Sequence, residues 1–535
     1  MTAAQQTAHS APVFVIFAVF VSCALFLAIW VTTDQTTPRA FYIGDGRLTP
    51  LQNGIAIFGV YLSAATVLGT PGLIALTGYD ALGYLKGAIV ALVVNLLLIA
   101  GRYHSTGQYT IGDRLVRRLH TRSVQVAGGV AALCICLVYV TAQMVGAGAL
   151  AAPVLGLEGP GARRIMVVSL GLLLILYVAI GGMRATTAVQ VVKAVLLLGG
   201  GGWLTMLVMS KVGWNPMLLL SRAADHSGLG DAFLQPGVSN GDGTMGKLDS
   251  FSLQLAVLAG AAGLPHVLGR LRTVPTARAA RRSVEVATWL TLAFCLMVTI
   301  LGFGAAALLG RTAIKVNSAT GNSAVLMLSE SLGGVILITL ISCVAFTTVL
   351  AVVSGVILTA STALAHDLYQ VGLMKGKASE KSELLVARGA VVLIGLTAIG
   401  LSLFAQGQNI TLLVGLAFAV AGSAVLPPLL YSMYWRHFTA KGALWSVYGG
   451  LISSVLLVVF SPALSGSPTS MLPHLDFAAF PLSNPAIVTI PLGFLLGWLG
   501  SVLDSREPDM AEYAETEVRV LAEVDVDRLV QSSGP

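Results

Sequence analysis

Charged residues are scarce in this sequence. Asp, Glu, Lys and Arg make up only 10% of its 535 residues, whereas 56% are hydrophobic, and the mean hydropathy is +0.85. A soluble domain needs a far more polar surface than this composition provides. The scarcity of charge therefore excludes one large soluble domain and predicts an all-α membrane protein that crosses a lipid bilayer many times.

Metal-ligand motifs and catalytic clusters are missing as well. The five cysteines lie within apolar runs and lack the spacing of a metal site, so we expect unpaired thiols. The predicted spans contain no pair of carboxylates, which argues against a membrane enzyme. Although the net charge is +7, basic loops beside membrane spans are far commoner than nucleic-acid sites, and no nucleic-acid partner is expected.

Thirteen apolar runs are long enough to cross a bilayer. They cover approximately residues 12–32, 49–77, 80–101, 124–155, 163–181, 186–210, 250–270, 284–309, 326–365, 387–406, 410–434, 442–461 and 486–504. The first is too long for the core of a signal peptide and is interpreted as a retained span. Most of the 31 Lys and Arg residues lie in the loops after odd-numbered spans, which predicts an N-terminus outside and a C-terminus in the cytoplasm.

The second span has an unusual centre, residues 55–71. It contains Gly59, Ser63, Thr66 and Pro71 in place of the Leu and Ile of a lipid-facing helix. Proline and glycine interrupt a helix, and an interruption at membrane depth is tolerated where the freed carbonyl groups face protein, water or a solute. The pattern predicts either a midplane binding site or a kink packed through small residues.

A second interrupted span, 252–270, is broken at Gly260, Gly263 and Pro265. Each broken span opens a group of five spans, and the two groups enter the membrane from opposite sides, as in transporters built from inverted repeats. The predicted organisation is an extra first span and linker (1–48), a first repeat (49–210), an extracellular loop (211–249), a second repeat (250–434), two peripheral spans (435–504) and an acidic, mobile cytoplasmic tail (505–535).

Several long motifs follow one another between about residues 40 and 460. They include Tyr61-Leu-Ser-Ala-Ala65, Tyr139 to Gly148, Gly181 to Thr187 with Gln190 and Lys193, Gly263-Leu-Pro-His266, and His366-Asp-Leu-Tyr369. Together they resemble the sodium:solute symporter family, and within it the cation/acetate (monocarboxylate) branch. The resemblance implies thirteen transmembrane helices with a leucine-transporter-type 5+5 inverted repeat. It also implies symport of a short-chain monocarboxylate, such as acetate, propionate or pyruvate, with a cation.

The resemblance places the solute between spans 2, 4 and 7. The matching positions are Ser63, Ala64, Thr66, Gln143, Gly260 and Gly263. Gln143 offers both donors and acceptors, and the amide dipoles at half-helix N-termini favour a carboxylate. The alternative for Gln143 is a hydrogen bond between helices with no ligand.

The positions that match the family's cation site depart from its pattern. They are Gly59, Leu62, Gln190, Lys193, Thr347, Thr348, Ala351 and Val352. In the family, sodium is bound by carbonyl groups of the broken helix, paired hydroxyls and often a carboxylate. Ala351 and Val352 stand where the hydroxyls are expected, and Gln190 stands where the carboxylate is expected. Thr347 and Thr348 are close enough in sequence to supply an oxygen. Val60 replaces an aspartate typical of the acetate branch.

Lys193 lies one turn after Gln190, inside a predicted span. In some amino-acid carriers of this fold, a lysine on the same helix takes the sodium position and carries a proton. An intramembrane lysine is energetically costly and is functional by default, although a lysine near a helix end can instead snorkel to the membrane surface. The coupling ion is therefore expected to be H+ or Na+, with the lost oxygens favouring H+, and no cofactor is expected.

Two rival functions stay open. One is sodium-coupled symport of another small solute, such as an amino acid, a vitamin or a sugar, and the other is a transport-deficient sensor with the same fold. The expected partners are a small carboxylate and the lipid bilayer of the plasma (inner) membrane. His266 belongs to a family motif and is interpreted as structural. The sequence makes no prediction about the oligomeric state.

Overall fold

The computed structural model describes residues 37–521 apart from short gaps, together with parts of 14–26. The gaps are 45–47, 106–108, 151–155, 157–158, 239–242, 467–469, 473 and 507–509. All regular elements of the described chain are helices. The described residues also contain one isolated β-bridge, between Ser465 and Leu472. The predicted all-α class is confirmed. Most of the predicted first span and residues 522–535 of the tail lie outside the described residues.

The helices of the first half run in the order α2 (Pro38–Ile43), α3 (Pro50–Tyr61), η2 (Ala65–Gly69), α4 (Thr70–Thr77), η3 (Gly78–Ala81), α5 (Leu82–Val94), η4 (Asn95–Ile99), α6 (Ala100–His104), α7 (Ile111–Leu119), α8 (Arg122–Gly148), α10 (Pro160–Lys211), α11 (Pro216–Ser227) and η5 (Gly230–Leu234). The second half contains α12 (Thr244–Ala262), α13 (Pro265–Leu268), η6 (Gly269–Arg272), α14 (Ala277–Leu309), α15 (Arg311–Asn317), α16 (Ala324–Thr362), η7 (Ala363–Leu373), α17 (Glu380–Phe404), α18 (Ile410–Ala424), α19 (Leu426–Tyr434), α20 (Ala440–Val459), α21 (Ala486–Val502) and α22 (Met510–Leu521).

Nine helices of the described chain are long and apolar enough to cross a membrane. Some of them hold more than one predicted span. The 52 residues of α10 turn sharply at Gly182, whose φ of +48° suits glycine, so that α10 covers the two predicted spans 163–181 and 186–210. A continuous helical stretch of 40 residues, Ala65–His104, likewise joins the end of the second predicted span to the third. The count of thirteen is not confirmed and stays a prediction.

Both predicted helix breaks are present. Helix α3 ends at Tyr61, Leu62 is extended, and the chain becomes helical again at η2. Pro71 does not cause this break, because it lies further along the chain, where η2 passes into α4 within continuous helix. The second break lies between α12 and α13, and there Pro265 does explain it. The residue before a proline avoids the helical region, and Leu264 is extended with ψ of 120°.

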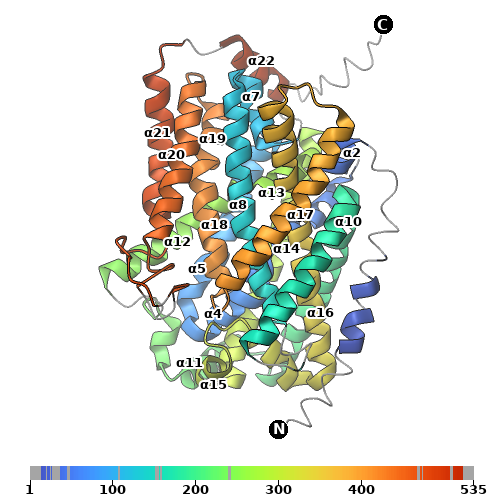
Figure 1. The fold of residues 1–535 in the computed structure, drawn as a ribbon. Coiled ribbons are helices and arrows are strands. Elements are labelled where there is room, and N and C mark those ends of the chain that lie inside the picture. Colours follow the sequence, from blue (N-terminus) through green and yellow to red (C-terminus); the bar gives the residue numbers. More distant parts are fainter. Residues whose placement is uncertain are drawn as a thin grey trace.

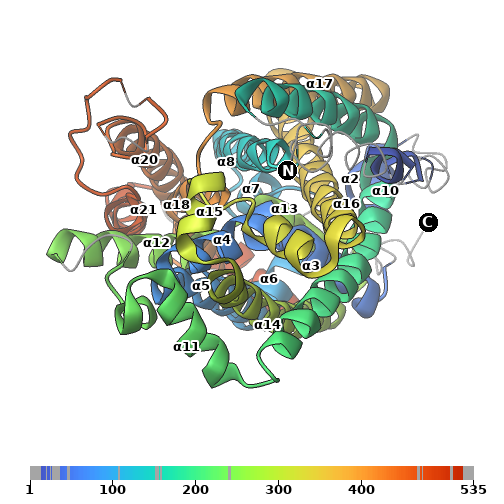
Figure 2. The same cartoon turned by 90° about the horizontal axis from the view of Figure 1, so that it is seen from below.

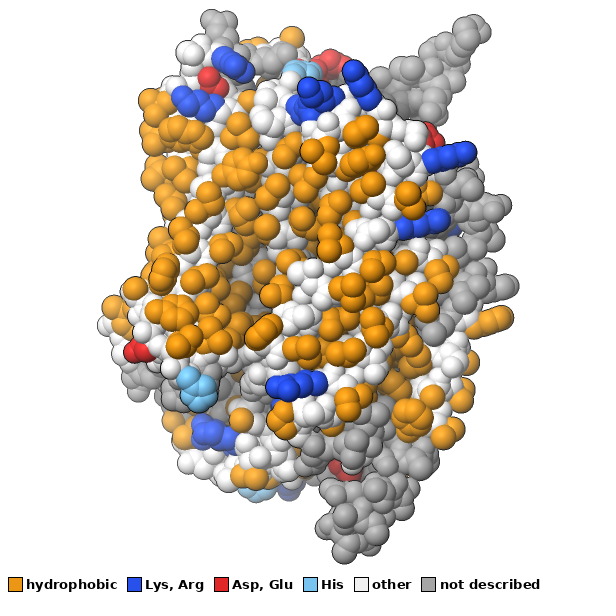
Figure 3. Space-filling model, in the orientation of Figure 1, with side chains coloured by type: hydrophobic (Ala, Val, Ile, Leu, Met, Phe, Trp, Pro, Cys, Tyr) orange, Lys and Arg blue, Asp and Glu red, His pale blue; other side chains and the backbone are white. Residues whose placement is uncertain are grey.

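The two broken segments lie in the middle of the bundle. Seen along the bundle axis, α3, α4 and α13 are surrounded by α10, α14 and α17 (Figure 2). The short helices α7 and α22 lie at one end of the bundle, and α11 and α15 lie at the other end (Figure 1). The side of the molecule in Figure 3 is covered by hydrophobic side chains, and most of its Lys and Arg side chains gather at the α7 end.

The acidic tail differs from the prediction of a mobile segment. Residues Met510–Leu521 form the amphipathic helix α22, which packs onto the bundle end. Glu517 forms an ion pair with Arg102, Arg118 lies 4.7 Å from the centre of the Tyr513 ring, and Glu512 lies 3.9 Å from His120. The sequence did not reveal these contacts because the tail's partners lie about 400 residues earlier in the chain.

Candidate functional site

The side chain of Lys193 lies at the first break. It comes from the middle of α10 and is fully buried. Its Nζ donates hydrogen bonds to the carbonyl oxygens of Gly59, at 2.5 Å, and of Leu62. These carbonyl groups are available because α3 ends at Tyr61 and the next turn of helix does not form. Lys193 therefore does not snorkel to the membrane surface but occupies the position between the two carbonyl groups.

No carboxylate of the described chain pairs with Lys193. An ammonium at this depth would be a buried charge held only by backbone dipoles, which is a costly arrangement. A neutral amine, in contrast, can donate the same two hydrogen bonds and keeps a lone pair that can accept a proton. The geometry therefore allows Lys193 to hold or release a proton without losing its position.

The remaining predicted coupling residues surround this lysine in part. Gln190 is fully buried, and its Nε2 donates to the Ala351 carbonyl oxygen at 3.2 Å, which joins α10 to α16. Thr347 and Thr348 are buried on α16, but their hydroxyls donate to carbonyl groups one turn earlier in their own helix. Val352 is buried and contributes no oxygen from its side chain. The structure thus brings together the two carbonyl groups, Lys193, Gln190 and Ala351, and leaves the two threonines bonded within α16.

The predicted solute residues also meet at the first break. Gln143 of α8 is fully buried, and its Oε1 accepts a hydrogen bond of 2.9 Å from the Ala64 amide. Its Nε2 has no hydrogen-bond partner. The Ser63 hydroxyl accepts from the Ala65 amide at 3.2 Å, and Thr66 is buried in η2. Gln143 therefore makes the predicted contact between helices and still carries an unused donor beside the break.

Gly260 has a packing role in this conformation. A Cβ atom built on it would lie 2.0 Å from the carbonyl oxygen of Phe418, and one built on Gly263 would lie 3.1 Å from that of Ala421. Only glycine permits α12 to approach α18 so closely at residue 260. The two glycines hold the second break against α18, and Gly260 offers no open surface to a solute here.

Two further polar side chains lie beside the breaks, and the sequence did not single them out as ligands. The centres of the Tyr139 and His266 rings are 4.9 Å apart, and both residues are buried. The Tyr139 hydroxyl lies near Ser63 but makes no hydrogen bond of ordinary geometry, and neither ring nitrogen of His266 has a partner. Leaving such groups unsatisfied is costly. Gln143, Tyr139 and His266 therefore form a set of unused hydrogen-bonding groups between the two broken helices.

A cluster of ionisable groups lies nearer the α7 end of the bundle. His366 lies between two carboxylates, with Nε2 3.0 Å from Asp113 Oδ1 and Nδ1 3.0 Å from Glu383 Oε1. Gln125 Nε2 donates to both Asp113, at 2.7 Å, and Asp367, at 3.0 Å. Burial raises the pKa of Asp113, but the hydrogen bond and charge of His366 outweigh it and hold that pKa below its ordinary value. The cluster joins α7, α8, η7 and α17.

The carboxylates of this cluster lie just outside the predicted spans. Ligand atoms of Asp113, His366 and Asp367 lie within 4.8 Å of one another, which is close enough to hold a metal ion. Several of these atoms already have protein hydrogen-bond partners, whereas Asp367 Oδ2 has none. In the sequence, only the motif that contains His366 and Asp367 pointed to this region. The contact with Asp113 could not be predicted, because Asp113 and His366 are 253 residues apart.

Little space connects the central breaks with this cluster. A cavity of about 30 Å³ lies between them, lined among others by Tyr42, Tyr109, Pro265 and Thr362. Such a volume holds only one or two water molecules. In this conformation the cavity has no room for a molecule much larger than water.

The model of the sodium:solute symporter family matches residues 41–450, which is more than half of the chain. The chain belongs to the sodium:solute symporter family. It is therefore a multi-pass membrane protein of a transporter family. The predicted resemblance is confirmed, and the two broken helices described above fall within the matched residues.

Two relatives are similar to this symporter-family chain over nearly its whole length. A protein of Corynebacterium glutamicum named monocarboxylic acid transporter is 43% identical over 97% of this chain and 95% of its own. A Bacillus subtilis protein named uncharacterized symporter YwcA is 41% identical over 95% of this chain and 97% of its own. The name of the first relative matches the monocarboxylate branch of the family.

A solved structure has the same fold. It shows a Na+-coupled sialic acid symporter in a substrate-bound, outward-open state. The match covers 92% of this chain and 98% of that chain, with a TM-score of 0.70 and 15% sequence identity. At this identity the likeness concerns the fold alone. It supports the leucine-transporter-type arrangement that the resemblance implies.

Proposed function

We propose that this symporter takes up a short-chain monocarboxylate together with a proton. The observation that carries the proposal is the position of Lys193, whose Nζ lies between the carbonyl oxygens of Gly59 and Leu62. A hard cation bound to the same two oxygens would overlap with this nitrogen and would be repelled by its charged form. The family's usual ion, sodium, is thus replaced by a proton on the lysine.

The carboxylate would bind among the unused groups between the broken helices. Gln143 Nε2 and the Tyr139 hydroxyl are donors without partners, and His266 can donate from either ring nitrogen. Hydrogen bonds to a charged group are the stronger ones, so a carboxylate gains most from such donors. The name of the Corynebacterium glutamicum relative supports the same class of solute.

The proton and the anion would travel as a neutral pair. Binding of a carboxylate at the first break places a negative charge near Lys193 and favours its protonated form. Movement of the walls beside Tyr42 and Tyr109 then opens the route toward the α7 end. Loss of the proton from Lys193 on that side releases the acid and returns the amine to its two carbonyl groups.

Sodium coupling is the second candidate, because the family as a whole is named for sodium. The Thr347 and Thr348 hydroxyls lie on the helix that packs against α3 and η2, and they would have to turn away from their own helix to bind an ion. This candidate also requires Lys193 to leave the two carbonyl groups.

The substrate class can be tested by competition. In proteoliposomes that contain the purified protein, uptake of labelled pyruvate is expected to be inhibited by acetate and propionate and to be unaffected by leucine, glucose or pantothenate. Inhibition by one of these other solutes, with none by the two acids, would contradict the monocarboxylate class. Liposomes without protein correct for passive entry of the neutral acids.

The distribution of charge supports a cytoplasmic position for the α7 end. Most Lys and Arg residues of the loops belong to that end, and we propose that the protein lies in the plasma (inner) membrane with α11 outside. In a Cys23→Ser background, Gln235→Cys is expected to react with a membrane-impermeant maleimide in intact cells, and Ser379→Cys only after permeabilisation. Both residues are exposed at their bundle ends. The opposite labelling pattern would reverse the orientation.

A further inference from the structure

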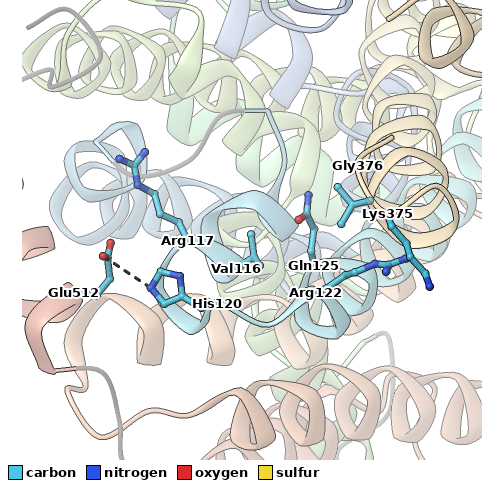
Figure 4. A pocket seen from close by; sticks show the side chains of 9 residues that line it. Val116, Arg117, His120, Arg122, Gln125, Lys375, Gly376 and Glu512 are labelled. Carbon is cyan, nitrogen blue, oxygen red and sulfur yellow. Dashed lines mark ion pairs between the residues drawn. The ribbon is translucent and has the colours of Figure 1, made fainter. Parts of the chain in front are cut away.

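A large cavity opens at the α7 end of the bundle, away from the proposed transport site. Its volume is about 710 Å³, and it lies between the end of α7, the start of α8, the turn after η7 and the start of α22. The side chains that carry its charge are Arg117, His120, Arg122, Lys375 and Glu512. Figure 4 shows Arg122 extending toward Lys375 on one side, and Arg117 beside the His120–Glu512 pair on the other.

The cavity has an excess of positive charge. Among the described residues that line it, Glu512 is the one carboxylate, and it is paired with His120. No carboxylate of the described residues forms an ion pair with Arg117, Arg122 or Lys375. Three cations that face one space without a counter-charge repel one another, and an anion placed between them removes that repulsion.

The backbone around the cavity favours an anion as well. Helix α8 is 27 residues long and begins at Arg122, and no side chain accepts a hydrogen bond from its first amides. The N-terminal end of a helix carries partial positive charge and binds phosphate groups. The cavity thus combines a free helix N-terminus with the unpaired Arg122 and Lys375 side chains.

Lys375 is held in a conformation that is costly for a lysine. Its φ is +56°, a left-handed value that glycine or asparagine adopts more readily, and the following residue, Gly376, also has a positive φ. Non-glycine residues in this region often occur at binding sites. The left-handed turn presents the Lys375 side chain beside that of Arg122 (Figure 4).

We propose that this cavity is a binding site for a phosphate-bearing anion. Its volume falls within the range of ordinary small-molecule sites, roughly 300–1,000 Å³. The guanidinium of Arg122 offers paired donors to phosphate oxygens, and Lys375 and Arg117 supply further positive charge for a group that carries more than one negative charge. The proposal does not depend on the transported solute or on the coupling ion.

The site adjoins the buried ionisable cluster. Gln125 lines the cavity, and its amide donates to Asp113 and Asp367. An anion in the cavity would therefore lie one side chain away from the cluster that joins α7, α8, η7 and α17. The helix α22 borders the same cavity through Glu512.

The site can be tested by titrating the purified full-length protein in detergent with pyrophosphate and measuring heat. Saturable binding is expected in the wild type, with about tenfold weaker binding in Arg122→Ala and in Lys375→Ala. Arg122→Lys should retain most of the affinity, because the charge is kept. Lys377→Ala is the matched control, since Lys377 is exposed in the same turn but does not line the cavity.

A second arm identifies the source of the phosphate group. The same proteins are placed in phosphatidylcholine nanodiscs with or without phosphatidic acid, and pyrophosphate binding is repeated. Binding that persists in both discs assigns a soluble ligand, and binding that phosphatidic acid prevents in the wild type assigns a lipid headgroup. The proposal is wrong if pyrophosphate binds the wild type and Arg122→Ala equally. It is also wrong if pyrophosphate binds neither protein and phosphatidic acid raises the unfolding temperature of both by the same amount.

Discussion

Proton-driven uptake is expected to fall at least about 100-fold when Lys193 is replaced by methionine. Methionine fills nearly the same volume but cannot carry a proton or donate to the carbonyl groups of Gly59 and Leu62. Without a titratable group at this position, entry of the carboxylate would have to proceed as a bare anion, which a dry membrane centre strongly disfavours. Initial rates of pyruvate uptake into proteoliposomes under an inward proton gradient measure the effect.

Lys86→Met is the matched control for this substitution. Lys86 also lies in a predicted span, but it is exposed and lies 5.2 Å from the centre of the Tyr79 ring, beside a separate cavity of about 200 Å³. Its replacement should leave the proton dependence unchanged. If Lys193→Met transports like the wild type and keeps its response to pH, then Lys193 only packs the break and the proposed coupling is wrong.

Gln143→Leu is expected to weaken carboxylate binding by about 10–100-fold, the loss associated with removing a hydrogen bond to a charged group. Leucine keeps the apolar packing of α8 and removes both the unused Nε2 and the acceptor for the Ala64 amide. The concentration of pyruvate that gives half-maximal uptake should rise by this factor. His266→Phe, which keeps the aromatic contact with Tyr139, should raise it too.

A purely structural role for Gln143 gives a different result. In that case Gln143→Leu would lower the temperature of unfolding but leave the half-maximal pyruvate concentration unchanged. Gln406→Leu serves as a control, because Gln406 lies just after α17 and its Nε2 donates to the carbonyl group of Ser402 in that helix. It should alter neither the affinity for pyruvate nor the dependence on pH.

The sequence predicted the features that depend on neighbouring residues. Glycine and proline act on the backbone next to them, so the second break could be placed at Gly263-Leu264-Pro265 from the sequence alone. The first break was predicted in the correct span, but its cause was assigned to Pro71 and the glycines around it, whereas the chain leaves the helix at Leu62. Lys193 was placed near the carbonyl groups of this break by matching positions along the family's motifs, and its hydrogen bonds fit that placement.

Features that depend on distant residues could not be predicted. Tyr139 and His266 lie on different helices 127 positions apart in the printed sequence, and only packing shows that their polar atoms lack partners. The partners of His366 come from α7 and α17, and neither Asp113 nor Glu383 stands out in its own segment. A sharp turn at one glycine, Gly182, joins two predicted spans within a single helix, so the number of helices differs from the number of predicted spans.

The central claim is that the proton on Lys193, and not sodium, drives uptake. The most direct measurement is labelled pyruvate uptake into proteoliposomes in sodium-free buffer, with the outside more acidic than the inside. Pyruvate is a strong enough acid to stay ionised, so passive entry is small and protein-free liposomes correct for it. Transient accumulation above equilibrium is predicted under the proton gradient, with none under a sodium gradient at equal pH. Accumulation that requires sodium and ignores the proton gradient would contradict the account.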